Sequence, residues 1–102
     1  EGERSLVKKY PNLKVNYLKV AHHGSNTSTS EEFLEHIETE HALISVGRNN
    51  HFGHPNNDVL ERLEDLDLNI QTTSENGAIM VKYFKIPFID YWFTKTYTAY
   101  EI

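Results

Sequence analysis

The chain has 102 residues, of which 38% are hydrophobic and 25% charged, as in an ordinary soluble globular protein. Its net charge of -5 argues against wrapping nucleic acid through a basic surface, although metal ions can supply local positive charge to an enzyme that cleaves phosphodiesters. The absence of cysteine excludes disulfides and thiolate chemistry. No apolar run approaches the roughly 20 residues of a membrane-spanning helix. Because the sequence begins at Glu1 without a signal-peptide pattern, we interpret it as a fragment of a longer protein.

Hydrophobic periodicity predicts alternating helices and strands, and therefore the α/β class. In chain order, we expect a helix over 1–10, a strand over 15–21, a helix over 31–38, a strand over 42–46, a helix over 55–66, a strand over 69–73, a turn over 75–77 and a strand over 78–84. Thr29 and Glu32 fit a capping box, and Pro55 suits the first position of the third helix. The aromatic tail from Pro87 is either a strand or a packed extension.

Two adjacent histidines, His22 and His23, follow the strand predicted over 15–21 and precede Gly24. Side chains at this end of a strand point into the crevice where α/β proteins bind ligands, and imidazole suits zinc, manganese or iron. Adjacent residues on an extended backbone point in opposite directions, so we expect one histidine to bind a metal and the other to touch substrate or orient ligands. The alternative is a surface pair without a role, because two neighbouring histidines are a weak metal signal.

The histidine pair begins a first polar loop, over 22–30. A second polar loop over 47–54 ends at His54, directly before Pro55. The positive end of the predicted helix lies there, so His54 could hold a phosphate or protonate a leaving oxygen. The alternative is a turn in which His54 merely caps the helix. Two such loops at one edge of a sheet are more informative than either alone. If the two strands are parallel, we expect His22, His23 and His54 to lie around one cleft at that edge.

Three stretches of the sequence carry a resemblance to a known family. They are VNYLKVAHHGSNTSTSEEFLE, ALISVGRNNHFGHPNNDVLERL and TTSENGAI, and they closely resemble the C-terminal domain of the ComEC proteins. ComEC proteins are bacterial membrane proteins of natural transformation that carry one strand of DNA into the cell. The resemblance extends from residue 1 to about residue 81 and implies the C-terminal half of a metallo-β-lactamase-like αββα sandwich. Residues 1–102 would then form a single partial domain, with 87–102 as a possible extension.

The resemblance also implies roles for individual residues. His23 matches the late metal ligand, and His22 beside it would be a catalytic residue that contacts phosphate, or the alternative ligand. His54 matches the family's Gly-His-Pro motif and would be an active-site, catalytic residue. Asn50 matches a polar position of the same loop, and we expect Asn50 and Ser25 to contact substrate.

The family's main metal motif, His-x-His-x-Asp-His, does not occur in this sequence. By resemblance it lies upstream of Glu1, together with an intermediate His and a bridging Asp. The complete domain would bind zinc or manganese between its two halves and act on DNA, as the soluble, extracellular domain of a bacterial cell-membrane protein. The partners implied are DNA and the N-terminal half of the same domain. We expect this chain alone to be inactive.

Three functions remain open at this point. The first is metal-dependent hydrolysis of phosphodiesters, with DNA as substrate. The second is a related hydrolase of the same fold that acts on another phosphoester, such as a choline-phosphate ester. The third is a metal-free interaction module that kept the fold. An intact upstream His motif after membrane spans would favour the first, the same motif without spans the second, and a degraded motif the third.

We expect the chain by itself to bind zinc or manganese weakly or not at all. One or two histidines leave most coordination positions to water, and no cysteine completes a site. Calorimetric titration should therefore show no tight stoichiometric binding. A sub-micromolar site formed by this chain alone would contradict the prediction.

Half of a two-sheet sandwich would leave one sheet face uncovered, which soluble monomers rarely tolerate. The residues expected to include this face are Val15, Leu18, Val20, Leu43, Ile44, Val46, Ile79 and Val81. We expect it to be covered by self-association or by the chain's own tail. The apolar tail residues available are Phe88, Ile89, Tyr91, Trp92, Phe93, Tyr97 and Tyr100.

Overall fold

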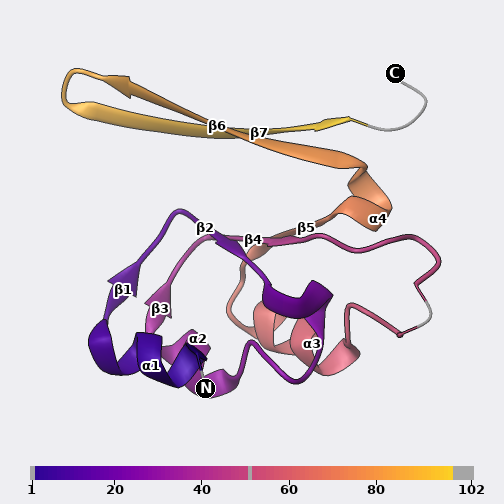
Figure 1. Cartoon of the computed structure of the whole chain (residues 1–102). Coiled ribbons are helices and arrows are strands. Elements are labelled where there is room, and N and C mark those ends of the chain that lie inside the picture. The colour runs from indigo at the N-terminus through magenta and orange to yellow at the C-terminus, as the bar shows by residue number, and fades with distance from the viewer. Residues whose placement is uncertain (1, 51, 98–102) are drawn as a thin grey trace.

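The protein is described by a computed structural model over residues 2–50 and 52–97 (Figure 1). Its elements in chain order are α1 (Gly2–Lys9), β1 (Leu13–Lys14), β2 (Tyr17–Lys19), the 3-10 segment η1 (Ala21–Gly24), α2 (Glu31–Glu35), β3 (Ile37–Glu38), β4 (His41–Ile44), α3 (Asn57–Asp65), β5 (Asn69–Thr72), α4 (Thr73–Asn76), β6 (Ala78–Ile86) and β7 (Ile89–Tyr97). The predicted α/β class is confirmed. Within the described ranges, no helix has the length and apolar character needed to cross a membrane.

The central sheet is parallel. Its strand order is β2-β4-β5, and the register pairs Leu18 with Ala42 and Ala42 with Ile70. A shorter parallel pair joins β1 to β3. Because all three central strands run the same way, the loops that follow them lie at one edge of the sheet.

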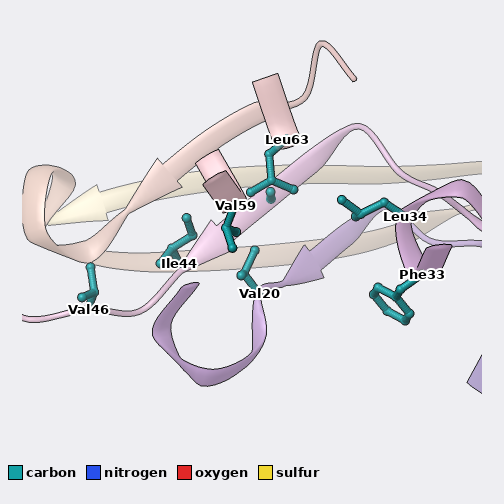
Figure 2. Close-up of a cluster of buried hydrophobic side chains, with 8 residues drawn as sticks. Val20, Phe33, Leu34, Ile44, Val46, Val59 and Leu63 are labelled. Carbon is teal, nitrogen blue, oxygen red and sulfur yellow. The ribbon is translucent and has the colours of Figure 1, made fainter. Parts of the chain in front are cut away.

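The hydrophobic core lies between the central sheet and the helices (Figure 2). Strand β4 alternates strictly, with Ala42 and Ile44 fully buried and their neighbours half-buried. Helix α3 contributes Val59 and Leu63 to the same core, both without exposed surface. The strand predicted over 42–46 is confirmed as β4, which begins one residue earlier and ends two residues earlier. The spacing of Val59, Leu60, Leu63 and Leu66 predicts one apolar face for the third helix, and the first three of these residues lie in or against the core, whereas Leu66 is 49% exposed.

Several predicted element boundaries differ in the structure, because side-chain caps and strand pairing set where the elements begin and end. Ser30, not Thr29, caps α2, since its hydroxyl accepts a hydrogen bond from the Phe33 backbone N–H (3.2 Å). Helix α2 ends before residue 37 because Ile37–Glu38 pairs with β1 as strand β3. The predicted turn over 75–77 is largely occupied by the short helix α4.

The third helix begins two residues later than predicted. Asn56 caps α3 by accepting a hydrogen bond from the Asp58 backbone N–H (2.8 Å). Pro55 is therefore outside the helix, and the alternative in which His54 caps it is also wrong. His54 is instead free of the helix and belongs to the preceding loop.

The aromatic tail forms a strand, one of the two alternatives that its sequence left open. Strands β6 and β7 pair as a long antiparallel hairpin, from Ala78 opposite Tyr97 to Ile86 opposite Ile89. Figure 1 shows the hairpin on the side of the central sheet away from α2 and α3. There, Trp92 of β7 contacts Tyr17 of β2 with ring centroids 5.8 Å apart.

The hairpin therefore lies where the tail was expected to cover the sheet. Leu43 is on the hairpin side of β4 by strand alternation, whereas Val20, Ile44 and Val46 belong to the helix-covered core. Tyr100 lies outside the described residues. Self-association stays a prediction.

Candidate active site

The segment after β2 has an unusual backbone conformation. His22 (φ 50°), His23 (φ 56°) and Gly24 (φ 82°) are three consecutive residues in the left-handed region. The expectation of an extended backbone at this pair is therefore wrong. A left-handed conformation costs a residue with a Cβ roughly 1–2 kcal/mol, and such strain persists where the surrounding structure holds it. Both imidazoles are exposed.

The His23 ring is oriented by the neighbouring strand. Its Nδ1 lies 2.5 Å from the backbone carbonyl oxygen of Ser45, directly after β4. A carbonyl oxygen can only accept, so in this contact Nδ1 is the donor, and a neutral ring bonded in this way carries its lone pair on Nε2. This is the arrangement in which metal-binding histidines usually occur, with one ring nitrogen donating to a backbone carbonyl and the other facing the metal.

The two loops meet through backbone groups. The Asn56 N–H donates to the Gly24 carbonyl oxygen (2.8 Å), so the start of α3 is tied to the end of η1. A Cβ on Gly24 would lie 2.6 Å from Pro55 Cβ, closer than side chains can approach. Contact between loops that follow β2 and β4 agrees with the predicted common edge. That His22, His23 and His54 face one cleft stays a prediction.

The Asn50 side chain bridges backbone groups within the second loop. Its Oδ1 accepts from the His54 backbone N–H (2.8 Å), and its Nδ2 donates to the carbonyl oxygens of His54 (2.7 Å) and Gly47 (3.1 Å). The amide is thus committed to holding His54 in place. Its predicted contact with substrate stays a prediction.

His54 itself is half-buried, with Phe52 stacked on its ring at a centroid distance of 6.0 Å. The Nδ1 atom of His54 is buried, and no described residue hydrogen-bonds to it. Buried polar side-chain atoms usually have a partner, so this nitrogen is suited to a group that the described part of the chain does not supply.

Ser25 interacts locally with Thr27. Its hydroxyl lies 3.0 Å from Thr27 Oγ1 and accepts from the Thr27 backbone N–H at 3.3 Å. It is half-buried, and its predicted role in substrate binding stays a prediction.

Two residues that position the loops were missed by sequence reasoning. The carboxylate of Glu3 in α1 accepts from the backbone N–H groups of Thr29 (2.6 Å) and Ser30 (3.0 Å), and so anchors the end of the first loop. The Thr73 hydroxyl donates to the Val46 carbonyl oxygen (2.9 Å) and accepts from the Val46 N–H (2.8 Å), and so fixes the start of the second. Both contacts join residues 26 or 27 positions apart, which no local pattern reveals.

A metal centre needs more ligands than the described residues bring together. They contain no group of three or more His, Asp or Glu residues placed to hold a metal ion. His23 fits a single ligand by the orientation of its ring. Zinc sites take three or four protein ligands, so the remaining ones would have to come from outside the described part of the chain.

The chain is similar to three curated bacterial proteins. It is 41% identical over 83 residues to ComE operon protein 3 of Bacillus subtilis (strain 168), a match of 81% of this chain and 11% of that protein. It is 39% identical over 72 residues to Recombination protein 2 of Haemophilus influenzae (71% and 9%), and 40% identical over 80 residues to Competence protein ComA of Neisseria gonorrhoeae (78% and 12%). No family model and no solved structure matches the chain.

The matched segment covers most of this chain but only about a tenth of the length of these relatives. Three proteins from different bacteria match at similar identity, and one of them is named a competence protein. The segment that the comparisons match therefore belongs to the ComEC family of competence proteins.

Proposed function

We propose that this chain is part of a metal-dependent phosphodiester hydrolase domain that cleaves DNA within a ComEC-type DNA-uptake protein. In this proposal the chain supplies one side of the active site, and the N-terminal half of the same domain supplies the other metal ligands. The domain would work outside the cell membrane, on the strand that is not transported or on DNA ends.

One observation carries the proposal, namely the contact between His23 Nδ1 and the Ser45 carbonyl oxygen. It leaves Nε2 as the ring atom able to bind a metal, and it uses a backbone group that the adjacent buried strand β4 holds rigidly. A surface histidine without a role gains little from a strained left-handed backbone, whereas a ligand needs a fixed ring orientation. The unpartnered Nδ1 of His54 supports the same interpretation, because it suits a group contributed by another part of the domain.

Each residue of this chain would then have a defined task. His23 would bind zinc or manganese, and His22 would contact the phosphate or serve as the alternative ligand. The metal ions, when bound, would supply an activated water and stabilise charge on the phosphate. His54 would donate a proton to the leaving oxygen, and Asn50 would hold the backbone on both sides of the His54 peptide unit.

The test is made in the complete domain, in which this chain follows its upstream half. We expect His23→Ala to lose most of the bound metal together with hydrolysis of a DNA substrate. We expect His54→Ala to keep its metal while turnover falls by about 10²- to 10⁴-fold, the contribution typical of a general acid. Metal content and the rate of DNA hydrolysis are measured on the same preparations.

His36→Ala is the matched control. His36 Nδ1 also lies at hydrogen-bond distance (2.8 Å) from a backbone carbonyl, that of Glu32, but His36 ends helix α2 and belongs to neither loop. It should retain metal and activity. Equal metal content in the wild type and the His23 variant would move the ligand role to His22 or overturn it. A complete domain that binds metal but leaves DNA intact would overturn the nuclease and favour another phosphoester as substrate.

A further inference from the structure

The β6–β7 hairpin differs in charge from the rest of the chain. Between positions 78 and 97 it carries the lysines Lys82, Lys85 and Lys95 against one acidic residue, Asp90, whereas the whole chain has a net charge of -5. All four side chains are exposed. The hairpin is therefore a locally basic ribbon attached to an acidic domain, which favours contact with an anionic surface.

The turn of this hairpin presents an apolar end to solvent. Ile86 is exposed, and Phe88 has a relative accessibility of 105%, so its ring touches almost nothing. The turn lies at the end of the hairpin remote from α4 (Figure 1). Fully exposing a phenyl ring forgoes the free energy that its burial would provide, so the position demands a reason other than packing.

The backbone conformation at Phe88 is also unfavourable for a phenylalanine. Its φ of 71° lies in the region that favours glycine, and a bulky residue there is strained. Neither local conformation nor packing within the described chain favours phenylalanine at this position. Strain of this kind points to a function for the residue that carries it.

Amphipathic aromatic side chains stand behind the apolar turn. Tyr83 and Trp92 face each other across the hairpin with ring centroids 4.4 Å apart, three residues before Ile86 and therefore about 10 Å from the turn. The Tyr83 hydroxyl donates to Asp90 Oδ1 (2.9 Å), which gives that carboxylate a partner close to the turn. Along the hairpin, the apolar turn is followed by Tyr83 and Trp92, with lysines alongside. In membrane proteins, apolar side chains reach the acyl chains, Tyr and Trp lie at the interface, and lysines meet the headgroups.

We propose that the turn of the β6–β7 hairpin inserts into the interface of an anionic lipid bilayer, with Phe88 as its deepest side chain. A single strand of nucleic acid would also suit lysines and aromatic rings. However, the Tyr83 and Trp92 rings lie against each other, and stacking of bases would not use the exposed aliphatic Ile86 at the turn. The geometry therefore favours lipid.

The test uses the whole 102-residue chain and mixed phosphatidylcholine–phosphatidylglycerol vesicles. We expect it to sediment with these vesicles more than with pure phosphatidylcholine, and added salt should weaken the binding. Trp92 is the only tryptophan, so its fluorescence should shift to the blue and be quenched by brominated acyl chains. Phe88→Asn should lower vesicle partitioning about tenfold or more, since a fully exposed aromatic ring no longer leaves water.

Phe88→Asn should be no less stable to urea than the wild type, because asparagine tolerates the left-handed backbone. The matched control is Tyr10→Asn, which removes another exposed aromatic ring beside a lysine, with Lys9 Nζ 5.5 Å from the ring centroid. It should leave vesicle binding unchanged. Absence of vesicle binding, equal binding by the Phe88 variant, or an equal loss in both variants would overturn the proposal. So would tighter binding of oligothymidylate than of vesicles, if that binding also required Phe88.

Discussion

Gly24→Ala should be the most damaging change at the candidate site, lowering the free energy of unfolding by about 2–5 kcal/mol. Two costs combine at this position. The backbone has φ 82°, where a Cβ is strained, and that Cβ would lie 2.6 Å from Pro55 Cβ and 3.0 Å from Pro55 Cα. The added methyl group must push the two loops apart, which also strains the hydrogen bond from Asn56 N–H to the Gly24 carbonyl oxygen. Urea unfolding followed by circular dichroism measures the loss.

Gly53→Ala separates the two costs. Gly53 also has a positive φ, of 68°, but its Cβ would meet no atom within 4 Å. This control should therefore lose only about 1 kcal/mol, the cost of the backbone conformation alone. If both variants were equally stable, the contact between the Gly24 and Pro55 loops would not form as described, and the shared site would lose its geometric basis.

Leu63→Ala should destabilise the fold by about 2–5 kcal/mol, as expected for a leucine deleted from a packed core. Leu63 has no exposed surface and lies on α3 within the cluster that includes Ile44 and Val59. The cavity would loosen α3 from the central sheet, and Asn56 at the start of α3 holds the first loop. The effect on stability is measured by urea unfolding, and a loss of signal dispersion in NMR spectra would report the loosened packing.

Leu66→Ala is the matched control for this prediction. Leu66 is the residue that ends the same helix, and it is 49% exposed. Its truncation should cost less than about 1 kcal/mol, since about half of its surface already meets water. Equal losses in the two variants would show that α3 does not pack its Leu63 side against the sheet.

The α/β class and much of the core follow from patterns within short stretches of the sequence. The run ALISV at 42–46 is apolar apart from Ser45, and a largely apolar run is expected of a strand covered on both faces. The spacing of Val59, Leu60 and Leu63 defines one helix face, because it matches the helical period. Residues 22–24 and 54–55 were recognisable as candidates because each follows a buried strand. Family membership was also accessible from sequence, since it depends on the same two stretches.

The geometry of the site was decided only by tertiary contacts. The left-handed backbone of His22 and His23 is stabilised by distant partners, among them the Ser45 carbonyl, 22 residues away from His23. Local preference alone predicts the opposite for residues with a Cβ, so the pattern suggested an extended chain. Glu3 and Thr73 hold the two loops through hydrogen bonds to backbone groups, and neither residue belongs to a recognisable motif.

The ends of the helices and the position of the tail were also decided by tertiary contacts between residues that are distant in the sequence. The end of α2 depends on strand β1, which pairs with Ile37–Glu38 although it lies more than 20 positions earlier in the chain. The aromatic tail could form a strand or pack as an extension, and it forms strand β7, which pairs with β6 and places Trp92 against Tyr17. Apolar composition measures how much surface a segment gains by burial, but the shape of the rest of the molecule determines where that surface can be buried.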